Sequence, residues 1–514
     1  MPIEDAIMEN IYGSQFECAC GRTHRIEPRE VLYCADAERR LPTLLAQYTG
    51  GRRVAVLMDA RTRQAAGLAV VEALAEHGWQ VNELLVADPA DGRSPVCDEP
   101  TFVDLRERLG APDILVPVGS GVINDVAKWL AADAELPFVC FATAASMNGY
   151  ASANVAPTIQ GVKTLRRARP PRAVVSSAAV LAAAPYELTA AGLGDVLAKS
   201  ASSSDWLMNH LLFGDYYCER AVGLIAEVEP RYLEHPERVR ACDEATLAAL
   251  FEALLLTGVA MTMAETSAPA SGAEHLLSHS LDMMSTIDGA PHDLHGRQVG
   301  VGTILAAALT ERVLALESPE FIEPTAGIDE AFWGPLAGAL AEQYAQKVAR
   351  LRQARAMLSQ GQAWDELRRR LEPLFRRPAT IQACLREAGA GSPTSAATAS
   401  ERSRRSRTRT KSARASPCSI WPVSSACSPP PPAPSSNNGG NGRPHYIDWS
   451  GFRRGACPRG LQRPGRPGRS SPASRKRIAN ARNSAGANRH CVLPIAEMNR
   501  LINLDERECY RYRR

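Results

Sequence analysis

The stretch 113–132, DILVPVGSGVINDVAKWLAA, decides the fold. Residues 113–118 form a short apolar run, which is typical of a buried strand, and the spacing of residues 122–132 predicts a helix directly afterwards. The same alternation continues along the chain on both sides. It predicts further strands at 53–58, 79–86 and 138–142, and further helices at 65–77 and 103–109. Strands that alternate with helices predict a parallel α/β sheet covered on both faces.

The residues between that strand and that helix indicate a ligand site. Gly119, Ser120 and Gly121 allow the backbone to approach a ligand closely, and a helix N-terminus offers free N–H groups and a partial positive charge. A pyrophosphate would fit there, and Asn124 and Asp125 add polar side chains in the first helical turn. A turn that serves packing alone is the alternative, because the G-x-G-x-x-G fingerprint is absent.

Two other strand ends carry polar residues. The loop 143–152, TAASMNGYAS, is small, rich in hydroxyl groups, and follows the strand expected at 138–142. Open α/β sheets bind ligands at this edge, although a simple Ser/Thr-rich connection is the alternative. Asp59 follows the strand at 53–58. It could accept a ribose hydroxyl, which would favour NAD, but Asp is also a common strand-terminating residue.

The pattern becomes helical from about residue 180. The expected helices are 185–191, 195–212, 215–228, 243–263 and 335–359. Asp195 lies just inside one of them, after two glycines and among small and apolar residues. A carboxylate in such a place is costly unless it is paired or bound to a metal, so Asp195 is a candidate metal ligand.

Histidines are concentrated in residues 271–302. Four of the ten fall there, namely His275, His279, His292 and His295. His275 and His279 are four residues apart and share one face of the helix expected from 274 to 284. His295 follows a turn at 288–291. Two imidazoles and the carboxylate of Asp195 can hold a divalent cation and leave a position open for a substrate. Ordinary surface or core histidines are the alternative.

Charge divides the chain into two unlike parts. Residues 401–514 carry 24 Lys and Arg against 6 Asp and Glu, whereas residues 1–400 carry 35 against 50. The first part has the acidity common in soluble enzymes. The second is rich in Arg, Ser and Pro, and such a composition predicts disorder. Its charge could attract nucleic acid. The alternative is that this tail is no selected domain but the product of a shifted reading frame.

The thirteen cysteines form no regular framework, which favours a reducing compartment. Cys18, Cys20 and His24 stand close together. They could bind a metal, but the C-x-C-x3-H pattern is weak without a further ligand pair nearby, and a structural turn is favoured. Neither a signal peptide nor an apolar run of membrane-spanning length is evident, so we expect a cytoplasmic protein.

Five ordered motifs carry a family resemblance over roughly residues 15–395. They are VGSGVINDVAKW, TAASMNGYAS, APYELTAAGLGDVLAKSASSSDW, SGAEHLLSH and LHGRQVGVGTI. In this order they resemble the sn-glycerol-1-phosphate dehydrogenases. This family is part of a metal-dependent alcohol dehydrogenase superfamily that also includes glycerol dehydrogenase and 3-dehydroquinate synthase.

The resemblance implies the domains and the roles of the residues. It implies an α/β dinucleotide-binding domain over 1–178 and an all-helical metal and substrate domain over 179–395, followed by the tail over 396–514. NAD(P) would contact Gly119, Ser120, Gly121, Asn124, Asp125, Thr143, Ser146 and Ser152. One divalent metal, zinc or nickel, would be bound by Asp195, His275 and His295. Asn148, Asp195 and His279 would contact the substrate, and Asp195 and His279 would be catalytic.

The implied reaction is the reversible NAD(P)H-linked reduction of dihydroxyacetone phosphate to sn-glycerol 1-phosphate. Asn148 departs from the family, which usually has Asp there, and this leaves the substrate preference open. Basic residues at 163–169 could recognise a phosphate or be merely solvated. The alternatives are a glycerol-type polyol dehydrogenase, a lyase resembling dehydroquinate synthase, and a nucleic-acid-binding protein acting through the tail. We expect a small phosphorylated substrate, a homo-oligomer as one possible assembly, and no nucleic-acid partner.

Overall fold

The structure is a computed structural model, and it describes residues 11–89, 94–159, 162–226, 228–290, 293–325 and 327–390. The side chains of residues 162, 163 and 286 are not described. The prediction of a disordered basic tail over 396–514 lies outside the described residues. The predicted division into domains at residue 178 stays a prediction.

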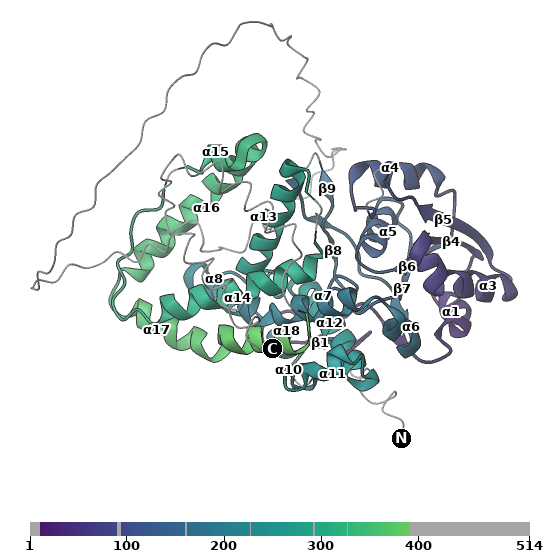
Figure 1. Cartoon of the computed structure of the whole chain (residues 1–514), viewed down its shortest axis with the longest axis horizontal. Helices are drawn as coiled ribbons and strands as arrows, with labels where there is room; N and C mark the ends of the chain where they lie inside the picture. The colour runs from purple at the N-terminus through teal and green to yellow at the C-terminus, as the bar shows by residue number, and fades with distance from the viewer. Residues whose placement is uncertain are drawn as a thin grey trace, which may run out of the picture. The chain divides into compact units, whose positions relative to one another are not determined.

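A six-stranded parallel sheet forms the first half of the fold, as the sequence predicts (Figure 1). Its strands, in spatial order, are β3 (Glu30–Tyr33), β12 (Ala173–Ser176), β7 (Val139–Ala142), β6 (Ile114–Gly119), β4 (Arg53–Asp59) and β5 (Gln80–Val86). Every neighbouring pair in this sheet is parallel. Four of the six strands coincide with the predicted ones within a residue or two.

Helices cover both faces of the sheet because successive side chains of a strand point to opposite sides. The helices are α1 (Ala37–Leu45), α2 (Ala60–Thr62), a π-helical turn (Arg63–Gly67), α3 (Leu68–Glu76), α4 (Glu99–Arg108) and α5 (Gly121–Asp133). In β4, Val54 and Val56 face the core shared with α1 and α3. Ala55 and Leu57 face the core shared with α4 and α5. Figure 1 shows these helix pairs on opposite sides of the strands.

Small antiparallel pairs accompany the sheet. They are β1 (Gln15–Glu17) with β2 (Thr23–Arg25), β8 (Asn154–Val155) with β11 (Arg166–Arg167), and β9 (Thr158–Ile159) with β10 (Val162–Lys163). Each is only two or three residues long, too short to show a sequence period.

Every regular element among the described residues after Ser176 is a helix. The elements are α6 (Ala178–Ala183), α7 (Tyr186–Leu197), α8 (Lys199–Phe213), α9 (Glu219–Gly223), α10 (Glu229–Leu233), α11 (Pro236–Arg240), α12 (Glu244–Ala264), α13 (Ala273–Asp288), α14 (His295–Leu314), α15 (Glu330–Trp333), a 3-10 turn (Gly334–Leu336), α16 (Ala337–Leu358), α17 (Ala363–Leu371), a second 3-10 turn (Glu372–Leu374) and α18 (Pro378–Glu387). The helical character predicted for this part is thus confirmed. The helix expected at 215–228 is shorter than predicted: Gly214 ends α8 in a left-handed conformation, and residues 214–218 run without regular structure into α9.

Helix α12 is the core of the helical part. It is long and apolar enough to cross a membrane, contrary to the expectation that no such run occurs, but 89% of its apolar stretch is buried within the structure. Leu250, Phe251 and Leu254 of α12 belong to one core cluster with Cys140 of β7 and Val174 of β12. The sheet and the helical part therefore share a continuous apolar core.

Candidate metal and nucleotide site

Three helices bring the predicted metal ligands together. Asp195 lies in α7, His275 in the first turn of α13, and His295 is the first residue of α14. Helices α7 and α14 approach closely because glycines face each other between them: a Cβ added to Gly194 would collide with the carbonyl oxygen of Gly296. The close crossing places a carboxylate of one helix beside the imidazole that opens the other.

The three side chains form a compact, largely buried group. One ligand atom from each lies within 4.8 Å of the others. The closest pair is His275 Nε2 and Asp195 Oδ1, at 3.4 Å. Asp195 is only 1% exposed and His275 only 5%. One oxygen and two nitrogen donors are a set that zinc and other first-row divalent cations accept.

Neighbouring polar groups orient each ligand. His275 Nδ1 lies 2.8 Å from Glu274 Oε1, and His295 Nδ1 lies 3.1 Å from the Ser278 hydroxyl. Ser278 in turn donates to Gln298 Oε1. Carboxylates and hydroxyls in such contacts fix the ring orientation and tautomer of metal-binding histidines. The contacts of Glu274, Ser278 and Gln298 with the predicted ligands were not predicted from the sequence. A signal did exist for Glu274, which directly precedes His275.

Buried negative charge makes the group suited to a cation. Asp195 Oδ1 and Glu274 Oε2 are buried and accept no hydrogen bond. A third buried carboxylate, Asp205, accepts a hydrogen bond from the backbone N–H of Ala273, and burial together with the charge of Glu274 raises its pKa. Burial lowers the pKa of His275, but the carboxylates of Asp195 and Glu274 outweigh it and raise the pKa to about 9. A divalent cation would compensate this charge, so the residues present fit a metal.

His279 lies beside the group without belonging to the ligand set. Its ring centroid is 6.3 Å from that of His275 and 5.8 Å from that of His295. The four-residue spacing on α13 therefore places His279 within reach of a molecule bound at the cation, as a substrate-facing residue requires.

The loop 143–152 connects the sheet to this group. The backbone N–H of Asn148 donates to Asp195 Oδ2 at 2.7 Å. The loop is held by the buried ammonium group of Lys128, which donates to the carbonyl of Gly149 and to the hydroxyl of Ser152. Lys128 is fully buried, and its contact with the loop was not predicted from the sequence.

The junction of β6 and α5 lies next to the same loop. The backbone N–H of Thr143 donates to the carbonyl of Gly119, so the ends of β6 and β7 are adjacent. A side chain at Gly121 would meet no atom within 4 Å, which leaves the helix N-terminus open to a ligand. Asn124 is fully buried, yet neither of its amide atoms has a hydrogen-bond partner. Asp125 lies 3.9 Å from Lys128 Nζ.

Other candidate residues are engaged elsewhere or stay exposed. Ser146 and Ser152 are buried, and the Ser152 hydroxyl faces Lys128 and the carbonyl groups of Gly149 and Asn154. Asp59 caps α2 and pairs with Arg61 at 2.8 Å, which agrees with its alternative role as a strand-terminating residue. Arg166 and Arg167 are exposed.

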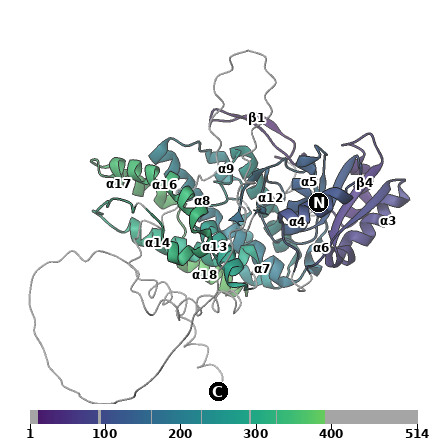
Figure 2. The same ribbon diagram turned by 90° about the horizontal axis from the view of Figure 1, so that it is seen from above.

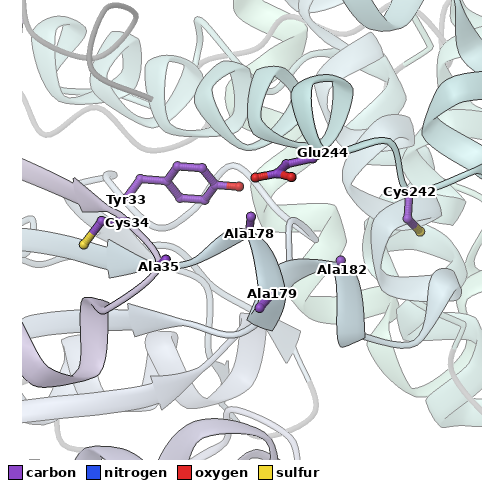
Figure 3. A pocket seen from close by; sticks show the side chains of 8 residues that line it. All are labelled: Tyr33, Cys34, Ala35, Ala178, Ala179, Ala182, Cys242 and Glu244. Carbon is purple, nitrogen blue, oxygen red and sulfur yellow. The ribbon is translucent and has the colours of Figure 1, made fainter. Parts of the chain in front are cut away.

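A surface hollow elsewhere has no part in this site. Its lining residues are Tyr33, Cys34, Ala35, Ala178, Ala179, Ala182, Cys242 and Glu244 (Figure 3). Figure 3 shows the side chains of Tyr33 and Glu244 pointing toward one another across it. None of the predicted site residues lines the hollow.

Comparison with known proteins identifies the family of this chain. The family model "Iron-containing alcohol dehydrogenase" matches residues 34–185. A glycerol-1-phosphate dehydrogenase [NAD(P)+] of Thermococcus sibiricus is 35% identical over 282 residues, which cover 55% of this chain and 77% of that protein. The enzyme of the same name from Bacillus subtilis is 30% identical over 291 residues, 56% of this chain and 73% of that protein. A solved structure of a probable glycerol dehydrogenase from Sinorhizobium meliloti is 20% identical, with a TM-score of 0.45, and the match covers 70% of this chain and 96% of that one.

These matches define a metal-dependent NAD(P)-linked oxidoreductase of the iron-containing alcohol dehydrogenase type. Within that class, the chain belongs to the glycerol-1-phosphate dehydrogenase family. The resemblance seen in the sequence is thereby confirmed. The roles of the individual site residues stay predictions.

Proposed function

We propose that this protein catalyses the reversible NAD(P)H-linked reduction of dihydroxyacetone phosphate to sn-glycerol 1-phosphate. The observation that carries the proposal is the buried group Asp195, His275 and His295, joined to the loop 143–152 through the Asn148–Asp195 hydrogen bond. The enzymes named glycerol-1-phosphate dehydrogenase that this chain matches support the choice of substrate.

Asp195, His275 and His295 would hold one divalent cation, zinc or nickel. When bound, such a cation acts as a Lewis acid on a carbonyl oxygen and stabilises the charge that develops there. The protein's own contribution is orientation. Glu274 sets the ring of His275, Ser278 sets the ring of His295, and the N–H of Asn148 fixes one oxygen of Asp195.

The nucleotide would lie along the carboxyl ends of β6 and β7. The open N-terminus of α5 at Gly121 suits a pyrophosphate, and the buried, unpartnered amide of Asn124 suits a hydrogen bond to the same ligand. Thr143 and Ser146 belong to the loop that leads from this edge toward Asp195. The loop would thus bring the nicotinamide toward the substrate.

His279 would supply the proton. In the reduction, C2 of the substrate gains a hydride from the reduced nicotinamide, and its oxygen gains a proton. An imidazole can donate near neutral pH, and His279 lies next to both ligand histidines on the same side of α13 and α14. In the reverse direction the same imidazole would accept the proton.

A cationic side chain would bind the substrate phosphate. Arg166 and Arg167 form the exposed strand β11 and are candidates to contact it. A glycerol-type polyol dehydrogenase, which lacks the phosphate, is the alternative within the superfamily. We also propose the division into domains near residue 178, a cytoplasmic location and a homo-oligomer.

The test compares phosphorylated and unphosphorylated substrates. NADH and NADPH oxidation are measured with dihydroxyacetone phosphate and with dihydroxyacetone, and the product is assigned to one enantiomer with enantiomer-specific coupling enzymes. The proposal predicts a kcat/KM at least about a hundredfold higher for the phosphorylated substrate, since a charge-assisted phosphate contact contributes about 3 kcal/mol. Equal values would favour the polyol dehydrogenase.

A further inference from the structure

Four metal-binding side chains meet at a second place, which shares no residue with the site above. Cys18 and Cys20 lie in the turn between β1 and β2, His24 lies on β2, and Cys218 begins α9. One ligand atom of each lies within 4.8 Å of the other three. Two hundred residues separate Cys18 from Cys218. Figure 2 shows the hairpin strand β1 beside α9.

The separations match a tetrahedral zinc site. A zinc–sulfur distance of about 2.3 Å places two sulfurs of a tetrahedron about 3.8 Å apart. The sulfurs of Cys18 and Cys218 are 3.8 Å apart, and Cys218 Sγ is also 3.8 Å from His24 Nε2. Cys20 Sγ lies 3.3 Å from His24 Nε2. A disulfide requires about 2.05 Å between sulfurs, so Cys18 and Cys218 are not joined as they stand.

The backbone of the β1–β2 hairpin places the side chains of Cys18, Cys20 and His24 close together. Gly21 takes a left-handed conformation, with φ of 83°, and its N–H donates to the carbonyl of Cys18. The N–H of Cys18 donates to the carbonyl of Arg22, which closes the turn. His24 is the buried residue of β2 and is only 3% exposed, although its two neighbours are exposed. This tight turn allows two sulfurs and one imidazole from seven residues to face the same side.

The fourth side chain, Cys218, comes from the break between helices α8 and α9. Residues 214–218 have no regular structure, although a helix was expected from residue 215. The indole N–H of Trp206 donates to the carbonyl of Tyr216. Cys218 is thereby fully buried at the start of α9 and faces the hairpin. Gly214 ends α8 in a left-handed conformation, and the Trp206–Tyr216 contact holds the following backbone so that Cys218 reaches the hairpin.

The surroundings suit negatively charged sulfur. The Tyr216 hydroxyl lies 3.1 Å from Cys20 Sγ, and the guanidinium group of Arg22 stacks on the Tyr216 ring at 3.5 Å. The guanidinium group of Arg220 lies 4.0 Å from the ring centre of Phe16 on β1. Three thiolates and one zinc ion leave a net charge of −1, which these cations partly balance.

We propose that Cys18, Cys20, His24 and Cys218 bind a structural zinc ion, which links the β1–β2 hairpin to the start of α9. With all four positions filled by protein atoms, such a site is closed to substrate and is structural rather than catalytic. The zinc joins segments almost two hundred residues apart, so it restricts the unfolded chain and stabilises the native contact between them.

Cobalt substitution tests the proposal on the full-length protein. The chain is produced with Co2+ as the only added transition metal, under reducing conditions, and its absorption spectrum and metal content are measured. The proposal predicts a near-ultraviolet sulfur-to-cobalt charge-transfer band, which the Asp195–His275–His295 group cannot produce because it contains no sulfur. No such band in folded wild-type protein overturns the proposal, and this result requires no variant to fold.

Variants assign the band to these four residues. Cys218→Ser removes one of the three sulfur ligands, so it is expected to weaken the band, to lower the affinity for one equivalent of cobalt, and to lower the midpoint of thermal unfolding by about 5 °C or more. Cys34→Ser, a change at a partly buried cysteine outside the cluster, is the matched control and is expected to keep the band. The comparison with Cys218→Ser is needed because five further cysteines lie beyond residue 390, at 418, 427, 457, 491 and 509.

Two results would contradict the assignment. A band of unchanged intensity in Cys218→Ser would show that other cysteines hold the cobalt. Thiol titration that finds Cys18 and Cys218 oxidised to a disulfide in metal-free, fully folded protein would replace the zinc with a covalent link. His275→Ala should leave the band unchanged, which separates this test from that of the proposed function.

Discussion

The two side-chain clusters differ in both their donors and their surroundings. Asp195, His275 and His295 offer one oxygen and two nitrogens, come from three crossing helices, and contact the loop at the carboxyl end of β7. Cys18, Cys20, His24 and Cys218 offer three sulfurs and one nitrogen and lie between a hairpin and the start of a short helix. The first set has three protein ligands, which leaves a coordination position for a substrate, whereas the second has four.

The number and type of donor atoms therefore suit the first cluster to the proposed chemistry and the second to the proposed structural ion. A catalytic cation needs an open position and a nucleotide nearby, and only the first cluster adjoins the open N-terminus of α5 and its loop. A structural ion needs complete coordination by protein atoms, and only the second cluster offers it. The following changes should affect the two clusters differently.

His275→Ala should have the largest effect. It removes one of three ligands and leaves the carboxylates of Asp195 and Glu274 buried without their imidazole, so we expect loss of this cation and a fall in kcat of at least about a thousandfold, equivalent to 4 kcal/mol. Steady-state kinetics and elemental analysis check both results. Retention of this metal would remove His275 from the ligand set.

His279→Ala should lower activity while it leaves the metal in place. Loss of a proton donor typically costs about a hundredfold or more in rate, whereas His279 is not among the ligands. Metal content, kcat and the pH dependence of kcat are measured on the same preparation. If metal is lost together with activity, His279 acts as a ligand, and the assignment of roles on α13 is wrong.

Glu274→Gln tests orientation rather than ligation. Glu274 is fully buried and contacts His275 Nδ1, and removal of such a partner costs about 10–100-fold in metal affinity. We expect activity to return when the metal concentration is raised. Unchanged affinity in a competition titration with a chelator would show that Glu274 does not act through His275.

Gly194→Ala tests the close approach of α7 and α14. The added methyl group would collide with the carbonyl oxygen of Gly296, so we expect a loss of about 1–3 kcal/mol in the free energy of unfolding and weaker metal binding. Gly338→Ala in α16 meets no atom within 4 Å and is the control, expected to keep metal binding and to raise the free energy of unfolding by no more than about 1 kcal/mol, the gain of Ala over Gly in a helix. Equal denaturation midpoints for the two variants would argue against this account of the helix crossing.

Local patterns could predict much of the fold. Strands β4, β6 and β7 are short apolar runs that end in or directly before a polar or glycine residue, and α12 is a long apolar run, so these elements can be located from the sequence. Strand β3 was not predicted because it lies at the sheet edge, where only Leu32 is buried, so it forms no continuous apolar run. The helix expected at 215–228 was wrong over most of its length because tertiary contacts of Tyr216 and Cys218 override helix propensity.

The candidate site could be predicted from the sequence only where local residue types and spacing indicate it. Asp195, His275 and His295 stand out as polar residues in apolar or helical settings, so their types and spacing indicate ligands. Ser278 and Gln298 orient a ring only after α13 and α14 have packed, and nothing in their local sequence predicts that contact. Cys218 is about two hundred residues from the hairpin, which is why the pattern of Cys18, Cys20 and His24 alone was incomplete.

The most direct measurement is NADH oxidation with dihydroxyacetone phosphate before and after removal of the catalytic metal. The full-length protein is assayed as purified, after treatment with a chelator, and after zinc or nickel is restored. The account predicts that activity disappears with the chelator and returns with the metal, while His275→Ala stays inactive throughout. Full activity in chelator-treated protein whose metal content is verified to be zero would contradict the account.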